Sequence, residues 1–343
     1  MEGEAETDFF FVGDRAQAFW DWDLKDKNLE FLQGLDPDYF VFIAQQMAPL
    51  LDDPDTCQYA AAALRVAYGQ GLETLMALVA AALQAPTCPL GWMLTYQPAE
   101  LRTFIEQIRR PAGSPLVYAT FHRPYIEGLA DEVLAPLPYP DSKRKWVVDG
   151  FAGFWYQASG DFVDSDMTAE YNAIKHGTRL TLGGTYWAIG RETVVGEAAP
   201  EMHSMGGSEF GSSIFIREKV AGDSVNWRPK RRSRNWSPDT WVRDLHLIAM
   251  SLQNLSSFLK TVAGVDPTTC QYQNPESPDL FERPETRIGL LGSSFDTRVS
   301  ASDIRRLSKA DVEAAIRRHW TRQTERIQHA VSGEESPCPQ LRR

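Results

Sequence analysis

The sequence has few cysteines and no long apolar run, and each scarcity excludes a class of protein. Its four cysteines are Cys57, Cys88, Cys270 and Cys338, and none lies within ten residues of another. This spacing excludes a disulfide framework and the paired Cys and His ligands of a structural zinc site. The longest apolar run, Leu75–Leu83, is far shorter than the roughly 20 residues that cross a bilayer. We therefore expect neither a metal nor a membrane span.

The N-terminal residues also lack the features of a secretion signal. Residues 1–8 are acidic, with no basic start and no apolar stretch after it. We therefore predict no signal peptide, and scattered single cysteines are typical of a reducing compartment. Together these features predict a cytoplasmic protein with no membrane association.

Basic residues are scarce in the first part of the chain. The 343 residues carry a formal net charge of -11, and residues 1–200 hold 14 Lys and Arg against 28 Asp and Glu. Residues 201–343 hold 21 Lys and Arg against 18 Asp and Glu. An acidic surface repels phosphates, which excludes general DNA binding by the whole protein. A local basic patch in the second part remains compatible with RNA binding.

Helical patterns dominate the rest of the sequence. The apolar segment Tyr59–Ala85 predicts a central buried helix, in which Gly69 and Gly71 either allow another helix to approach closely or mark a kink. A further helix is expected from Pro98 to Ile108, and alternating segments between residues 179 and 222 predict a small antiparallel sheet. The predicted fold is mainly α, a helical bundle with a small inserted antiparallel β-sheet. We expect a disordered tail over 1–8, the bundle over 9–264, and a C-terminal extension over 265–343 with one Arg-rich helix.

The clearest periodicity lies between Ser237 and Ala263. Apolar residues recur there at alternating steps of three and four, which predicts an amphipathic helix of about seven turns. Packing inside the protein's own bundle is one interpretation of this stripe. A seam between two copies, giving a homodimer, is the other.

One segment, Glu170–Arg179, contains a candidate site. On a helix, Asn172 and His176 are four residues apart and share a face, and Tyr171 and Lys175 share the adjacent one. With Arg179 nearby, this arrangement suits an anion such as phosphate, and His176 with Asn172 is the candidate catalytic pair. A structural alternative is that Asn172 and His176 tie the helix to the sheet by hydrogen bonds, while Arg179 fixes the start of the first strand.

The segment Tyr171–Arg179, followed by a strand with Gly183 and Gly184, resembles a segment in a family of uncharacterised, mostly helical bacterial proteins. More distantly, a helical bundle with a polar helix ending in His is similar to the HEPN superfamily. That resemblance implies a ribonuclease of a toxin or defence system, or an inactive member of the fold. In the HEPN signature, four to six residues separate an Arg from the His, and at the matching positions this chain has Tyr171, Glu170 and Ala169.

A second candidate is a basic segment bounded by two tryptophans. Interleaved aromatic and basic side chains stack bases and contact phosphates, and a solvated loop is the alternative interpretation. The candidate ligand-binding residues of this segment are Trp227, Arg228, Lys230, Arg231, Arg232, Arg234 and Trp236.

These observations leave three hypotheses for function. The first is a non-catalytic interaction protein on a HEPN-like helical scaffold, with an unidentified protein partner. The second is an RNA- or nucleotide-binding protein that uses Lys175, His176 and the basic segment. The third is a ribonuclease of a defence or toxin system. None of the three requires a cofactor, and we predict none.

Overall fold

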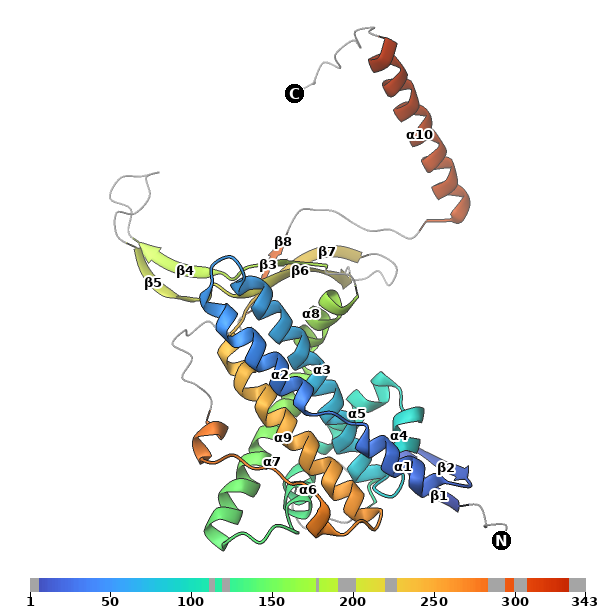
Figure 1. The fold of residues 1–343 in the computed structure, drawn as a ribbon. Coiled ribbons are helices and arrows are strands. Elements are labelled where there is room, and N and C mark those ends of the chain that lie inside the picture. Colours follow the sequence, from blue (N-terminus) through green and yellow to red (C-terminus); the bar gives the residue numbers. More distant parts are fainter. Residues whose placement is uncertain are drawn as a thin grey trace. The chain divides into compact units, whose positions relative to one another are not determined.

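A computed structural model of the chain describes residues 6–110, 115–118, 124–176, 179–190, 202–219, 227–282, 294–298 and 307–332 (Figure 1). The chain forms two compact units. Unit 1 consists of Met1–Ile214 and Arg232–Asp296, and unit 2 consists of Phe215–Arg231 and Thr297–Arg343. The sequence predicts the main boundary near Gly264 instead, because strands that run from one unit into the other have no signature in composition.

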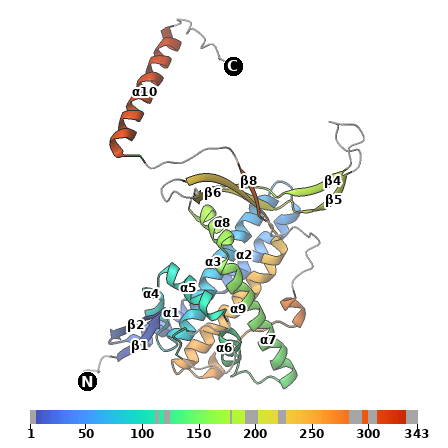
Figure 2. The same cartoon turned by 180° about the vertical axis from the view of Figure 1, so that it is seen from behind.

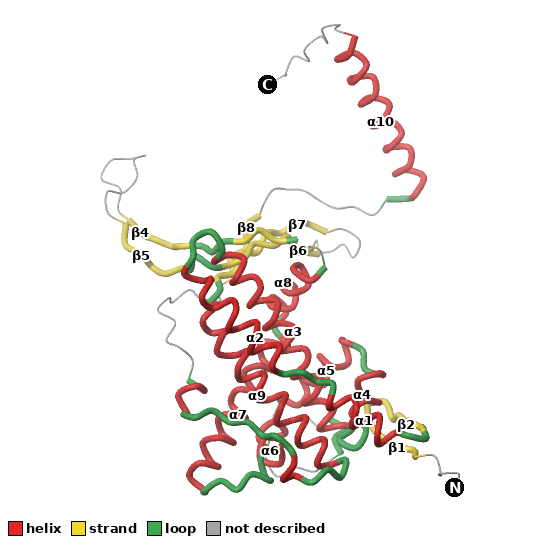
Figure 3. Tube along the Cα trace, viewed as in Figure 1, coloured by secondary structure: helices red, strands yellow, loops and turns green. Residues whose placement is uncertain are grey.

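The fold is mainly α, with small antiparallel sheets, as the sequence predicts. The α-helices of unit 1 are α1 (Leu24–Gln33), α2 (Asp38–Met47), α3 (Cys57–Gln84), α4 (Pro89–Thr95), α5 (Pro98–Ile108), α6 (Tyr125–Val133), α7 (Asp141–Val163), α8 (Ser165–Lys175) and α9 (Pro238–Val262). Its short 3-10 helices are η1 (Ala48–Asp52), η2 (Pro267–Thr269) and η3 (Pro278–Phe281). Figure 3 distinguishes these helices from the strands.

Helix α3 lies at the centre of unit 1, beside α2 and α9 (Figures 1 and 2). It is apolar on nearly all sides, so burying it removes a large apolar area from water. Among the described residues it is the one helix long and apolar enough to cross a membrane, but 78% of its most apolar stretch is buried in the protein. A central core helix has the same composition.

The two glycines of α3 allow the close approaches that the sequence predicts. A Cβ at Gly69 would overlap the ring of Tyr171 on α8. A Cβ at Gly71 would lie 3.0 Å from Cδ1 of Ile248 on α9. Each glycine therefore marks the point where one neighbouring helix packs against α3.

Helix α9 buries its apolar stripe inside unit 1. Leu245, Ile248, Leu255 and Leu259 are fully buried in the core. Pro238 is at the first turn, and Gly264 follows the helix with a positive φ of 89°. The stripe is thus covered within the chain, which confirms the bundle interpretation of this helix.

The N-terminal aromatic stretch forms a β-hairpin that the sequence did not predict. Strand β1 (Glu6–Val12) pairs antiparallel with β2 (Arg15–Asp21), with Phe9 opposite Ala18. Phe10 and Val12 face the core, whereas Phe9 and Trp20 face outward. The strand begins at Glu6, inside the segment expected to be a tail.

The remaining strands form two further antiparallel arrangements. Their bounds are β3 (Leu180–Leu182), β4 (Tyr186–Gly190), β5 (Met202–Gly207), β6 (Gly211–Lys219), β7 (Trp227–Asn235) and β8 (Ser294–Arg298). β4 pairs with β5, and the four-stranded sheet has the order β3-β6-β7-β8. The sheet extends past residue 222, where the sequence predicts that it ends. Strand β7 was not predicted because charged rather than apolar residues alternate along it.

In unit 2 the main element is α10 (Lys309–Ser332). The hydroxyl of Ser308 accepts a hydrogen bond from the Asp311 backbone N–H at 3.2 Å, which caps the start of the helix. The side chains of Val312, Ile316 and Trp320 are exposed. This helix is therefore the Arg-rich helix expected in the C-terminal extension.

Candidate functional site

Helix α8 positions the candidate segment from both ends. At its start, Oδ1 of Asp164 accepts hydrogen bonds from the backbone N–H groups of Asp166 (2.7 Å) and Met167 (3.0 Å). Asp164 is therefore the N-cap of α8. After the helix, the Arg179 N–H donates to the Ala173 carbonyl at 2.9 Å and fixes the chain that enters β3.

The proposed catalytic pair lies at the C-terminal end of α8. The His176 N–H donates to the Asn172 carbonyl at 3.0 Å, so the two residues are one turn apart as expected. His176 is exposed and Asn172 is half-buried. Neither side chain has a hydrogen bond to any residue that the structure describes, so they do not tie the helix to the sheet. Of the three residues in that alternative, Arg179 is the one with a hydrogen bond that holds the chain before β3, through its backbone N–H.

Tyr171 and Lys175 turn towards α3. The Tyr171 hydroxyl donates to Oε2 of Glu73 at 3.2 Å, and Nζ of Lys175 lies 3.3 Å from the same oxygen. Burial raises the pKa of Tyr171, and the negative charge of Glu73 raises it further. Because Glu73 already balances Lys175, this position is less suited to the anion that the sequence suggested.

A buried ion pair anchors α8 to α3. Arg65 of α3 and Glu170 of α8 are 1% and 2% exposed, and Nε of Arg65 donates to Oε2 of Glu170 at 2.8 Å. Nη2 of Arg65 donates to the Met167 carbonyl at 2.9 Å. Burying a charge is costly unless it is paired, so this arrangement commits α8 to one position on α3.

The second carboxylate oxygen of Glu170 connects the helices to the sheet. Oε1 accepts a hydrogen bond from the indole Nε1 of Trp236 at 2.8 Å, and one from the hydroxyl of Ser212 in β6. Trp236 also packs edge-on against Trp241, whose ring lies 5.7 Å from the Arg65 guanidinium. One carboxylate therefore joins α3, α8, β6 and the residue that follows β7.

The candidate site residues expected from the sequence include neither Arg65 nor Glu170. A lone cation in the middle of a buried helix implies a buried acidic partner. Arg65 is such a cation, but the neighbouring sequence does not show which of the many carboxylates in the chain pairs with it.

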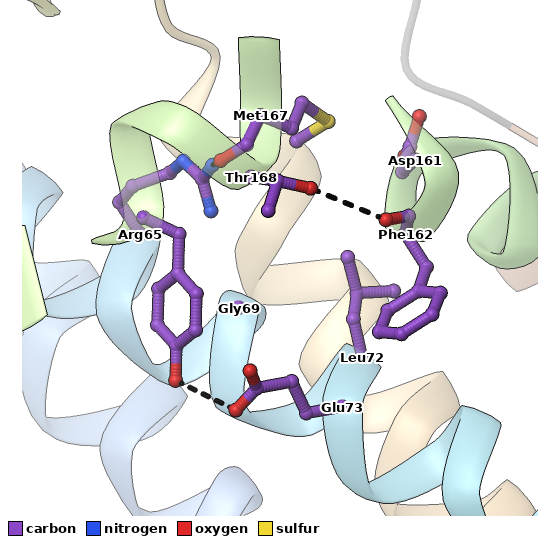
Figure 4. A pocket seen from close by; sticks show the side chains of 9 residues that line it. Arg65, Gly69, Leu72, Glu73, Asp161, Phe162, Met167 and Thr168 are labelled. Atoms are coloured by element: carbon purple, nitrogen blue, oxygen red, sulfur yellow. Dashed lines mark hydrogen bonds between the residues drawn. The ribbon is translucent and has the colours of Figure 1, made fainter. Parts of the chain in front are cut away.

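A pocket opens beside Arg65, between α3, the end of α7 and the start of α8. It is a small cavity of about 40 Å³ that is open to solvent on one side. Arg65 and Glu73 project into it from α3, and Leu72, Phe162 and Met167 supply apolar walls (Figure 4). The wall also includes Gly69, Asp161, Thr168 and Tyr171.

One side chain in the pocket wall has an unpartnered polar atom. Nη1 of Arg65 is buried and has no hydrogen-bond partner among the residues that the structure describes. Figure 4 shows the Arg65 guanidinium at one end of the pocket, with Glu73 at the other end. A buried donor without an acceptor costs free energy, so an oxygen atom placed here would be stabilised.

The basic segment forms β7 rather than a loop, and its side chains are divided between several environments. In unit 1, Arg232 pairs with Asp166 and Arg234 lies 3.8 Å from Asp164. Trp236, proposed as a base-stacking residue, is 2% exposed. That role of Trp236 is therefore wrong, because its indole is committed to Glu170.

The part of β7 that belongs to unit 2, residues 227–231, has a different environment. Nζ of Lys230 lies 3.2 Å from Oε1 of Glu218. The half-buried ring of Trp227 is covered by Arg217 at 4.9 Å and Lys219 at 5.7 Å. Arg228 and Arg231 are exposed. Cations and an aromatic ring therefore do lie together on this part of the strand.

No cluster of three or more His, Cys, Asp or Glu side chains that could hold a metal occurs among the described residues. Comparison of the chain with protein-family models, with curated proteins and with solved structures finds no match. Function must therefore be inferred from the chemistry of this chain's own residues.

Proposed function

We propose that the chain is a non-catalytic interaction protein, in which a helical scaffold carries α10 as a recognition helix for a protein partner. The observation that carries this proposal is the exposed apolar stripe of α10. Val312, Ile316 and Trp320, four residues apart, are 40%, 50% and 62% exposed. This spacing places them on one side of the helix.

Such a stripe is a recognisable binding element. An amphipathic helix binds a groove by inserting apolar anchors spaced three or four residues apart. Tryptophan is the residue type most often found at the energetic centre of such interfaces. A helix that packs against no other element is only marginally stable in water. A partner that covers the stripe would therefore also stabilise α10.

The charges on α10 define the partner more closely. On a helical projection, Arg317 and Arg322 lie on opposite sides of the stripe, each about 100° or more from its centre. A complementary groove therefore has an apolar floor and acidic rims. Rim charges of this kind set the association rate and the choice of partner.

The candidate catalytic pair gives this proposal indirect support. A general base must be held within hydrogen-bond reach of the group that it activates. His176 is exposed, and its side chain has no hydrogen bond to a described residue that would orient it. The HEPN-like ancestry of the scaffold remains part of the proposal and rests on the helical bundle and on the position of His176 at the end of α8.

RNA binding is the second candidate, and the charge of unit 2 favours it. Unit 2 contains 15 Lys and Arg against 8 Asp and Glu, whereas unit 1 contains 20 against 38. A concentrated positive charge attracts phosphates in a salt-dependent manner. Exposed Arg228 and Arg231 and the aromatic side chains of Phe215 and Trp320 belong to this unit.

The test uses the full chain with a photo-crosslinking amino acid at position 316, irradiated in its source cells. We expect a partner protein to be captured through an acidic, apolar-floored segment. Trp320→Glu should remove that adduct, and Thr321→Glu, a matched change on the opposite side of α10, should retain it. Capture of a second copy of the chain would show that the partner is the protein itself, in a homodimer.

Two outcomes contradict the protein-interaction proposal. One is an adduct that survives Trp320→Glu unchanged. The other is retention of cellular RNA by the purified chain at low salt that is lost at high salt and in Arg317→Glu/Arg322→Glu, which would favour the RNA candidate. RNA cleavage by the wild type and not by His176→Ala would instead indicate a ribonuclease.

A further inference from the structure

The two strands of the β1–β2 hairpin differ in what lies beside them. The hairpin projects from one end of unit 1, where β1 packs against α1, α3 and α4 (Figures 1 and 2). Strand β2 pairs with β1 alone, and no described helix packs against β2 to a comparable extent. The outer edge of a strand presents backbone N–H and C=O groups with which another strand can pair.

The turn of the hairpin decides which backbone groups of β2 point outward. Val12 and Arg15 pair on either side of a two-residue loop, so they form a hydrogen-bonded pair. Such pairs alternate along a hairpin with pairs that exchange no hydrogen bond. Ala18 opposite Phe9 belongs to the second kind. The N–H and C=O of Ala18 therefore point away from β1.

The outward groups are satisfied on β1 but not on β2. The outward N–H of Phe9 donates to Oδ1 of its neighbour Asp8 at 3.2 Å. On β2 the outward groups belong to Ala16, Ala18 and Trp20, which are all exposed. None of these groups bonds to a described residue outside the hairpin. The outer edge of β2 is therefore the one that another strand can extend.

The sequence of β2 is complementary to itself in the antiparallel direction. With Ala18 opposite its own copy, Ala16 lies opposite Trp20 and Arg15 lies opposite Asp21. A small side chain then faces a large one, and a positive charge faces a negative one. This register pairs all seven residues of β2. A two-fold axis through Ala18 repeats every contact, as in an isologous dimer.

The same register covers part of an exposed aromatic face. Phe9, Trp20 and Trp22 are 68%, 56% and 59% exposed. Within the hairpin, Ala16 lies opposite Phe11. An indole placed over Ala16 of a second copy therefore reaches the Phe11 ring of that copy. Cross-strand aromatic contacts of this kind stabilise a sheet.

From this geometry we propose that β2 pairs antiparallel with β2 of a second copy, centred on Ala18, to form a dimer with one continuous four-stranded sheet. The three outward residues of each copy supply about six backbone hydrogen bonds. Arg15 and Asp21 already pair with Glu100 and Lys27, so their contact across the dimer mainly selects the register. The interface uses no residue of α10 and is separate from the interaction proposed for that helix.

Sedimentation velocity of the full chain over a range of micromolar concentrations tests the interface. We expect a dimer for the wild type. Ala18→Lys places two like charges opposite each other on the two-fold axis, and should raise the dissociation constant about tenfold or more. The matched control is Ala135→Lys, at an exposed alanine after α6, which should leave the dimer unchanged. Circular dichroism checks that each variant is folded.

Cysteine crosslinking tests the register, in a Cys270→Ser/Cys338→Ser background. Two copies of Ala18→Cys bring their Cα atoms to about 5.5 Å, within the range that a disulfide spans. Two copies of Ala16→Cys lie about 13 Å apart along the strands, too far for a disulfide. We therefore expect the Ala18→Cys variant to form a covalent dimer with mild oxidant much faster than the Ala16→Cys variant.

Four outcomes overturn the proposal. The first is a wild type that stays monomeric over the whole concentration range. The second is a dimer that Ala18→Lys leaves intact, and the third is equal crosslinking of the two cysteine variants. The fourth is a dimer that Trp320→Glu removes and Ala18→Lys does not, which would show that α10 holds the copies together. Conversely, Ala18→Lys should leave capture of a partner through α10 unchanged.

Discussion

Unit 1 and unit 2 place their large side chains and their charges in opposite ways. Among the described residues, the largest fully buried side chains, Trp92, Trp155 and Trp236 included, all belong to unit 1. In unit 2, Phe215 and Trp320 are 66% and 62% exposed. Unit 1 is strongly acidic by composition and unit 2 is basic. Unit 1 therefore supplies its own stability, whereas the apolar side chains of unit 2 are available to another molecule.

The same substitution in each unit tests this contrast with the largest expected effect. Arg65→Met should lower the free energy of unfolding by about 3–5 kcal/mol, because Glu170 would remain as an uncompensated buried charge. Arg317→Met in α10 should change it by less than about 0.5 kcal/mol, as for an ordinary surface residue. Urea unfolding followed by circular dichroism measures both.

A double variant shows whether the charge or the packing is responsible. Replacing both partners, Arg65→Met with Glu170→Met, should recover much of the lost stability, since the buried pair then becomes apolar. If the double variant is as unstable as Arg65→Met alone, the hydrogen bonds of Glu170 to Trp236 and Ser212 matter more than its charge.

Two glycines sharpen the contrast between the interior and the surface of unit 1. Gly69→Ala should destabilise by about 1–3 kcal/mol, because the added methyl group would overlap Tyr171. Gly153→Ala, exposed in the middle of α7 with open space at its Cβ, should stabilise by about 0.5–1 kcal/mol. Thermal unfolding of the two variants gives opposite shifts if the packing is as described; shifts of the same sign would contradict it.

Alkaline pH provides a further test of the interior. Burial, with help from Glu73, holds the pKa of Tyr171 above its usual value of 10.0. Above that pH the unfolded chain loses the tyrosine proton while the folded chain keeps it, so stability falls as the pH rises. Tyr171→Phe should flatten this part of the curve, as measured by unfolding at several pH values. Tyr59→Phe, on the surface, is the control and should not flatten it.

The smallest effect on stability is expected at the most exposed aromatic residue of α10. Trp320→Ala should leave the main unfolding transition within about 0.5 kcal/mol of the wild type. Its effect should appear instead in partner capture, as described above. A large loss of stability in differential scanning calorimetry would show that the α10 stripe is covered within the chain after all.

Much of the helical fold was predictable because its signals are local. Pro98 and Glu100 define the start of α5, where the carboxylate of Glu100 accepts from the Gln97 N–H at 2.9 Å. The stripe of α9 repeats over its whole length, so its period identifies it without any neighbour. The sequence of Arg287–Leu291 also predicts a strand, but that segment lies outside the described residues.

The strands and the site were harder to predict because their signals depend on distant partners. Phe9–Phe11 shows no alternation, so the β1–β2 hairpin has no period-two pattern until its pairing is known. Arg65 and Glu170 are separated by 105 positions and meet only when α3 and α8 pack. Asn172 and His176 were correctly placed on one helix, but periodicity does not show what the helix faces.

The pairing of α3 with α9 has a consequence for the synthesis of the protein. Their contacts include the stacked rings of Tyr68 and Trp241, 6.2 Å apart. About 150 residues separate the end of α3 from the start of α9, which at roughly 5–20 residues per second takes about 8–30 s to translate. During that interval the nascent chain contains the apolar helix α3 while α9, which packs against it, has not yet been synthesised. Chaperones that bind exposed apolar helices therefore have time to bind α3.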